Sequence, residues 1–182
     1  MKDKKILISS LLVFVFSLAI NFSLPSKASL LSIPNFHKVD EQLYRGGLLK
    51  TEQDILNLKK IGIKTVINLE WDGLLRESSG IKKEQEWCQK ADIKFIHIPL
   101  FPTKAPKKND VEKILALIET SDSPVYVHCR HGVDRTGFIT AMYRIKYEKW
   151  SLVNAYNEMI NLGFHNHYFF YWKKFLLRYT GI

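Results

Sequence analysis

The sequence predicts an α/β domain with a central, mostly parallel sheet of about four to five strands flanked by helices. Apolar runs with strand character alternate with amphipathic helical segments between residues 35 and 179. A strand at 125–128 leads through a short cysteine-containing loop into a further helical pattern. A hydrophobic content of 46% over 182 residues supplies the core of one domain and excludes a disordered chain.

The elements are expected in the order β-β-α-β-α-β-α-β-loop-α-α-α. Thr51 with Asp54 three residues later forms a capping box, and Gly62 is a typical C-terminal glycine, so a helix lies between them. Asn109 should begin another helix. The strands are expected at 35–39, 42–45, 63–69, 93–100 and 125–128. The helices are expected at 51–61, 81–91, from 109 through 118, and at 138–147, 151–162 and 168–179.

The first 28 residues have the three-part pattern of a secretory signal peptide. Three lysines precede an apolar run from Ile6 to Ile20, and Ser26-Lys27-Ala28 places small residues at the spacing that a signal peptidase accepts. We expect cleavage after Ala28, which leaves residues 29–182 as an exported domain, periplasmic or secreted. The alternative is an uncleaved membrane anchor that holds the domain outside the cytoplasm, because the run can extend to Leu24.

The net charge of the chain is +9, and residues 29–182 account for +6 of it, because the first 28 residues hold four lysines and one aspartate. Such a surplus favours anionic ligands in general and selects no single class. Binding to nucleic acid has only this charge in its support, so we expect no nucleic-acid partner.

Cys88 and Cys129 are the two cysteines of the chain. Cys88 falls in the expected helix 81–91, where burial as a small apolar residue is its default role. An exported protein meets an oxidising compartment in which cysteines commonly pair. A disulfide between the two therefore stays open as an alternative, and it would silence any chemistry at Cys129.

The stretch 125–137 (VYVHCRHGVDRTG) predicts a phosphate-binding loop. A strand that enters a tight loop at the start of a helix points backbone N–H groups inward and adds the positive end of the helix. Gly132 allows the backbone to bend closely around a ligand, and Arg135 can make a two-pronged contact with two phosphate oxygens. The residues expected to bind the substrate are Arg130, His131, Gly132, Val133, Asp134 and Arg135.

Cys129 lies at the base of this positive field, where a thiol should have a pKa below its reference value of about 8.5. Its thiolate is expected to attack phosphorus and form a cysteinyl-phosphate intermediate. Arg135 and the loop amides would stabilise the transferred phosphoryl group. Thr136 can donate its hydroxyl to the sulfur and help it depart, and His128 is expected to hold the loop through a hydrogen bond.

The pattern His-Cys-x-x-Gly-x-x-Arg-Thr-Gly at 128–137 resembles the signature of the cysteine-dependent protein tyrosine and dual-specificity phosphatases. Upstream, 43–47 (LYRGG) and 58–69 (LKKIGIKTVINL) are similar to the opening of compact bacterial, plant and fungal atypical dual-specificity phosphatases. The resemblance implies a protein tyrosine phosphatase-like fold, a mechanism without metal or cofactor, and a phosphorylated protein or other phosphomonoester as substrate. We also expect a monomer.

One departure from that family concerns the acid that protonates the leaving group. Much of the family takes it from an aspartate on an upstream loop, but the matching loop here, 101–108, contains no acidic residue. Three candidates remain. Asp134 lies inside the phosphate loop, as in the myotubularin-like lipid phosphatases, whose loop also ends Asp-Arg-Thr. Asp72 could swing over the pocket, and Asp110 suits the start of its helix. Asp134 is favoured.

Three alternative functions are weighed against a protein phosphatase. Arg130, His131 and Asp134 motivate a phosphoinositide or inositol-phosphate phosphatase. The missing upstream aspartate motivates a pseudophosphatase that binds phosphate without turnover. A rhodanese-like sulfurtransferase also uses a cysteine loop, but Gly132 and the Arg-Thr-Gly ending fit phosphate better.

Overall fold

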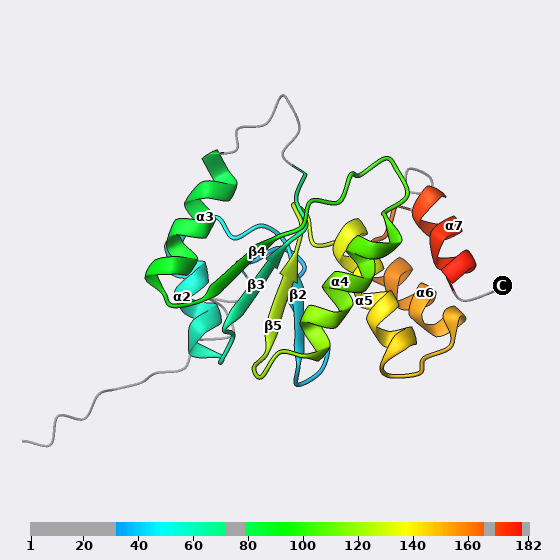
Figure 1. Ribbon diagram of the computed structural model, residues 1–182, viewed down its shortest axis with the longest axis horizontal. Helices are drawn as coiled ribbons and strands as arrows, with labels where there is room; N and C mark the ends of the chain where they lie inside the picture. Colours follow the sequence, from blue (N-terminus) through cyan, green and yellow to red (C-terminus); the bar gives the residue numbers. More distant parts are fainter. Residues whose placement is uncertain (1–31, 72–78, 166–169, 180–182) are drawn as a thin grey trace, which may run out of the picture.

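The computed structural model describes residues 32–71, 79–165 and 170–179, which form a central sheet with helices on both faces (Figure 1). The expected signal segment, residues 1–28, lies outside the described residues. The strands are β1 (His37–Lys38), β2 (Leu43–Gly46), β3 (Thr65–Asn68), β4 (Lys94–His97) and β5 (Val125–His128). The helices are α2 (Glu52–Lys60), α3 (Ser79–Lys90), α4 (Lys108–Glu119), α5 (Asp134–Lys146), α6 (Leu152–Asn161) and α7 (Phe170–Tyr179).

The sheet has five strands in the order β1-β2-β5-β3-β4, and all neighbours pair in parallel except β1 with β2. This confirms the predicted mostly parallel sheet. In the register, His128 at the end of β5 lies opposite Gly46 of β2 and Asn68 of β3. Three strands therefore end together, and the loop that begins at Cys129 leaves the sheet at the edge where open α/β sheets bind ligands.

Each face of the sheet buries its own apolar cluster. Helices α2 and α3 lie on one side, while α4 and α5 lie on the other with α6 and α7 beyond them (Figure 1). Cys88 belongs to the first cluster and Cys129 to the second, and both are free thiols. The disulfide that the sequence left open is therefore not formed.

The helices α3, α4 and α5 each start before the predicted position, α3 by two residues and α4 by one. The capping box at Thr51 and Asp54 is present as expected, but α4 begins at Lys108 behind Lys107, which makes no side-chain capping bond. Asn109 is therefore not the cap. Burial of four apolar side chains stabilises this helix in place of a cap; they are Val111, Ile114, Leu115 and Ile118.

Helix α5 begins at Asp134, four residues before the expected Phe138, so Arg135 and Thr136 lie in its first turn. The sequence concealed this start because the first ten residues of α5 are all buried, polar ones included, and a helix buried on all sides lacks an amphipathic stripe.

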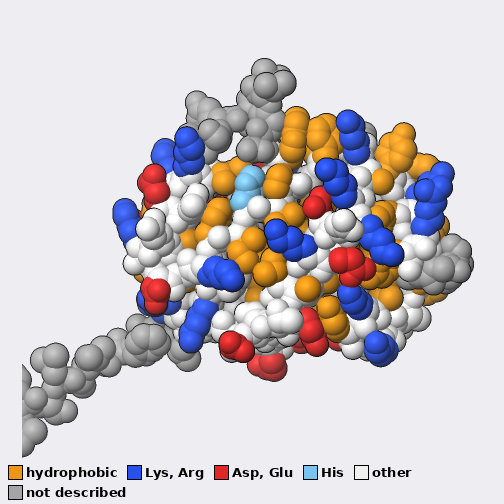
Figure 2. All heavy atoms as spheres, in the orientation of Figure 1, with side chains coloured by type: hydrophobic (Ala, Val, Ile, Leu, Met, Phe, Trp, Pro, Cys, Tyr) orange, Lys and Arg blue, Asp and Glu red, His pale blue; other side chains and the backbone are white. Residues whose placement is uncertain are grey.

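The surface charge is dispersed. Figure 2 shows Lys and Arg side chains spread over the visible face, with acidic side chains among them. Within the described ranges, no helix has the length and hydrophobicity needed to cross a membrane.

Candidate active site

The loop between β5 and α5 is packed against the end of β2. Gly132 has a φ of 72°, and a Cβ atom there would lie 2.4 Å from the carbonyl carbon of Gly46. Only glycine fits this combination of left-handed backbone and close approach. The Nδ2 of Asn35 donates to the carbonyl oxygen of His131 at 2.9 Å, and the amide of Leu48 donates to that of Arg130 at 3.2 Å.

Cys129 is 2% exposed at the base of this loop. Burial by itself would raise the pKa of its thiol, but the positive charge of Arg135 and the hydroxyl of Thr136 oppose that effect. Backbone amides of Thr136 and Gly132 also point to the sulfur, and together these groups bring the pKa of Cys129 below its ordinary value. The site therefore favours a thiolate.

Arg135 and Thr136 are both buried beside this sulfur, in the first turn of α5. The Nη1 of Arg135 donates to the carbonyl oxygen of Leu69, just beyond β3, at 3.3 Å. The hydroxyl of Thr136 has no oxygen or nitrogen partner among the described residues and faces the sulfur. The structure thus brings together the expected nucleophile, the expected phosphate-binding arginine and the expected hydroxyl donor.

The buried partner of His128 is the carboxylate of Glu84, which the sequence analysis did not predict. The Nε2 of His128 lies 2.6 Å from Oε1 of Glu84, and both side chains are fully buried. Asn68 donates to the other oxygen of Glu84 at 2.8 Å, and the His128 Nδ1 lies 3.3 Å from the carbonyl oxygen of Cys129. Burial by itself would lower the pKa of His128, but Glu84 raises it overall.

The sequence contained a signal for this carboxylate. Glu84 lies three residues after Ile81 and four before Cys88, so it falls on the apolar stripe of its helix. A charged residue on a stripe that faces the core needs a buried partner.

Asp134 connects the loop to a second residue that the sequence analysis missed. Its carboxylate is buried and accepts a hydrogen bond from the backbone amide of His165 at 2.8 Å. The His165 Nδ1 lies 3.1 Å from each carboxylate oxygen, and the His165 side chain is 55% exposed. The two residues are 31 positions apart, so no local pattern could have revealed the contact.

The structure describes the other expected residues except Asp72. Arg130 and His131 are exposed directly after Cys129, and Val133 is buried. Asp110 lies in the first turn of α4, the position that helix-dipole stabilisation favours. Asp72 lies outside the described residues.

Three comparisons place these features among known proteins. The family described as a DSP-PTPase phosphatase fused to NAD+ kinase matches residues 28–166. Dual specificity protein phosphatase TpbA of Pseudomonas aeruginosa, strain UCBPP-PA14, is 29% identical over 134 residues, which cover 71% of this chain and 55% of that protein. Inositol diphosphatase DSP3 of Arabidopsis thaliana is 27% identical over 131 residues, which cover 68% of this chain and 60% of that protein.

The crystal structure of P. aeruginosa TpbA matches with a TM-score of 0.64 and 25% identity, over 80% of this chain and 84% of that one. The chain spans between 55% and 60% of the length of the two curated relatives. Because the family match covers well over half of the sequence, the chain belongs to the family whose model is described as "DSP-PTPase phosphatase fused to NAD+ Kinase".

Proposed function

We propose that this domain is a cysteine-dependent phosphatase that hydrolyses phosphomonoesters through a cysteinyl-phosphate intermediate. The observation that carries the proposal is the buried thiol of Cys129, whose pKa is lowered by Arg135 and by the amides of the loop. An anion-binding loop with an ionised nucleophile at its base is what in-line attack on phosphorus requires.

The reaction takes two steps. The thiolate of Cys129 attacks phosphorus, the P–O bond to the leaving group breaks, and that oxygen takes up a proton. Water then attacks the cysteinyl phosphate, the P–S bond breaks, and the hydroxyl of Thr136 stabilises the departing thiolate. In both steps Arg135 and the loop amides bind the equatorial oxygens, where charge develops.

We assign the proton for the leaving group to the pair formed by Asp134 and His165. The carboxylate of Asp134 is fixed by the backbone amide of His165 and by its Nδ1, which contacts both oxygens, and the imidazole is half exposed beside the loop. A carboxylate that orients an imidazole in this way is a common arrangement for proton transfer. In this proposal the pair replaces the acid that loop 101–108 does not contain.

Phosphotyrosine is the first candidate substrate, because the related P. aeruginosa TpbA has been crystallised in complex with phosphotyrosine. An inositol phosphate is the second, because several Arabidopsis relatives are named inositol diphosphatases. The exposed Arg130 and His131, next to the nucleophile, suit a substrate that carries additional phosphate groups.

The proposal is tested with residues 29–182 under reducing conditions. We expect hydrolysis of an aryl phosphate and of phosphotyrosine peptides, abolished in Cys129→Ser and retained in Cys88→Ser, since Cys88 packs in the opposite core cluster. Rates of hydrolysis of a panel of inositol phosphates in the same assay compare the second candidate with phosphotyrosine. Phosphate binding without cysteine-dependent turnover would favour a pseudophosphatase.

We further propose that residues 1–28 direct export and are removed. The support is the pattern of lysines, apolar run and small residues before Ser29. Expression of the full chain in a bacterial host should yield an extracytoplasmic product whose N-terminal residue is Ser29. A product that keeps its first residues and stays in the membrane fraction would favour the anchor.

A further inference from the structure

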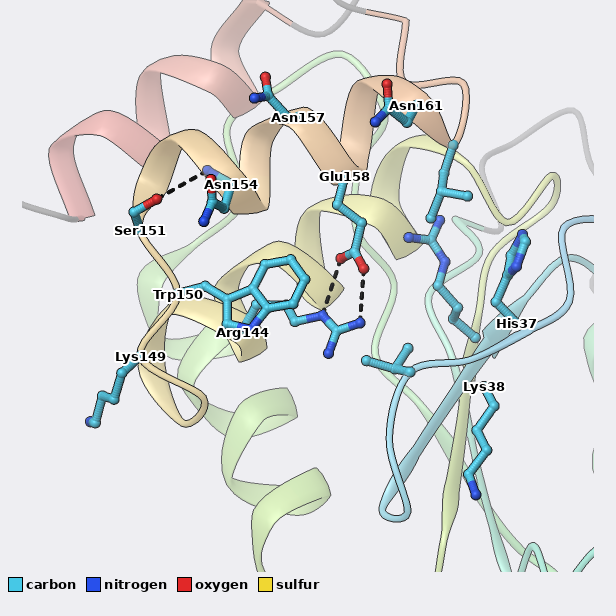
Figure 3. Close-up of a pocket in the computed structure, with 13 residues that line it drawn as sticks. His37, Lys38, Arg144, Lys149, Trp150, Ser151, Asn154, Asn157, Glu158 and Asn161 are labelled. Carbon is cyan, nitrogen blue, oxygen red and sulfur yellow. Dashed lines mark hydrogen bonds and ion pairs between the residues drawn. The ribbon is translucent and has the colours of Figure 1, made fainter.

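A cavity of about 730 Å³ lies between strand β1 and helix α6, with Arg45 of β2 in its lining (Figure 3). In Figure 3, His37 and Lys38 stand on one side of it, and Arg144, Trp150 and the polar side chains of α6 stand on the other. This volume falls within the range of roughly 300–1,000 Å³ that is typical of small-molecule sites.

The lining of this cavity is strongly basic. It contains four cations and a single carboxylate, that of Glu158; the cations are Lys38, Arg45, Arg144 and Lys149. Arg144 is already paired with Glu158 at 2.8 Å and with Glu148 at 2.7 Å. Burial lowers the pKa of His37 and the charge of Arg45 lowers it further, while the carboxylate of Glu158 opposes both effects.

Arg45 is the unusual member of this lining. Its side chain is 1% exposed, and its Nε and Nη1 have no hydrogen-bond partner among the described residues. Buried donors of a charged group are costly to leave unpaired. Burial lowers the pKa of Arg45 to about 10, a direction that a bound anion would oppose.

We propose that this cavity is a second binding site, for a small molecule that carries a phosphate group, and that Arg45 binds the phosphate. A guanidinium presents two parallel donors that match phosphate oxygens. Asn154, Asn157 and Asn161 line one helical face of α6, where their amides can bind the polar remainder of such a molecule.

The same arginine connects this site to the catalytic loop. Its Nη2 donates to the carbonyl oxygen of Gly132 at 2.6 Å, and its charge interacts favourably with the thiolate of Cys129. An anion bound at Arg45 would oppose the field that favours that thiolate. Occupation of the cavity should therefore weaken phosphate binding in the catalytic loop, and occupation of the loop should weaken binding in the cavity by the same factor. Because less of Cys129 is then thiolate, turnover should also fall.

Binding is tested by NMR titration of the protein with inorganic phosphate, a readout that needs no turnover and so is independent of the proposed function. The backbone amide of Gly132 reports the loop, and the side-chain amide of Asn157 reports the cavity. We expect two separate saturation curves in the wild-type protein. Lys149→Glu should weaken binding in the cavity roughly threefold, because it replaces a cation of the lining by a carboxylate.

The matched control is Lys94→Glu, which reverses an exposed lysine on β4, at the opposite edge of the sheet. Both curves should be retained in this variant. The second site is overturned if the chemical shift of the Asn157 side-chain amide does not change with phosphate. It is also overturned if this shift reaches half-saturation at the same phosphate concentration in the wild type and in Lys149→Glu.

Coupling is tested by product inhibition at saturating substrate, where competition at the loop vanishes. Phosphate should lower kcat of the wild type and of Lys94→Glu roughly fivefold, because a smaller fraction of Cys129 is then thiolate. It should leave kcat of Lys149→Glu at that variant's own phosphate-free value. Inhibition that is purely competitive in all three proteins overturns the coupling through Arg45.

Discussion

The carboxylate of Glu84 and the imidazole of His128 form a fully buried pair, with 2.6 Å between Oε1 and Nε2. Glu84 comes from α3, and Asn68 of β3 holds its second oxygen at 2.8 Å. His128 is the last residue of β5, directly before Cys129. The pair therefore ties the start of the catalytic loop to two other elements of the fold.

Glu84→Gln should lower the free energy of unfolding by about 2 kcal/mol at about pH 6, because a buried hydrogen-bonded ion pair is lost. The pKa of His128 is raised above its ordinary 6.5, so this stabilisation is full below that pH and declines as pH rises through the raised value. Urea unfolding of both proteins should therefore show a difference that narrows at higher pH. Glu86→Gln, an exposed neighbour, should change stability by less than about 0.5 kcal/mol. A difference that widens with pH would contradict a charged His128.

Gly132→Ala should abolish turnover, because the new Cβ would collide with the backbone of Gly46 and displace the phosphate loop. Gly62→Ala is the matched control, since it also has a positive φ but no atom within 4 Å of the added Cβ. It should cost about 1 kcal/mol of stability through backbone strain and retain turnover. Kinetics and thermal unfolding of the two variants separate steric displacement from strain. Equal activity in both would contradict the close contact with Gly46.

Thr136→Val should raise the pKa of Cys129, because the hydroxyl that stabilises the thiolate is lost while the side-chain volume is kept. The rate of alkylation by iodoacetamide against pH measures this value directly. In the wild type the inflection should lie below the ordinary value of about 8.5, and it should move upward in the variant. Cys88 is buried with a pKa raised to about 12, so it should contribute little; Cys88→Ser provides the check. An unchanged inflection would exclude the role of Thr136.

Asp134→Asn should flatten the limb of the pH–rate profile in which the rate falls as pH rises, because that limb reports the proton donor. We expect a loss of kcat of roughly 100-fold on substrates with a poor leaving group. His165→Asn should affect the same limb if the imidazole delivers the proton that Asp134 positions. Asp110→Asn, which removes a carboxylate at the start of α4, should leave the profile unchanged. A wild-type profile in Asp134→Asn would exclude the pair as the acid.

The sequence was most informative where the relevant contacts are local. The capping box of Thr51 with Asp54 and the strand 125–128 were predicted as the structure shows them, because both depend on neighbours in the chain. The start of α4 was predicted wrongly, since burial and not a cap stabilises that helix. The start of α5 was missed because its first turn is buried on all sides.

The sequence by itself was enough to predict a phosphate-binding loop, since Cys129, Gly132 and Arg135 lie in one short stretch of backbone between a strand and a helix. Only the tertiary structure decided what holds that loop. Glu84 reaches His128 across 44 residues, His165 reaches Asp134 across 31, and Arg45 reaches Gly132 across 87. Such contacts follow from the order in which parallel strands assemble and from which helix covers each face, and no local periodicity encodes that order. The proposed second site depends on the same long-range placement, because Arg45 meets both the loop and the cavity only after β2 pairs with β5.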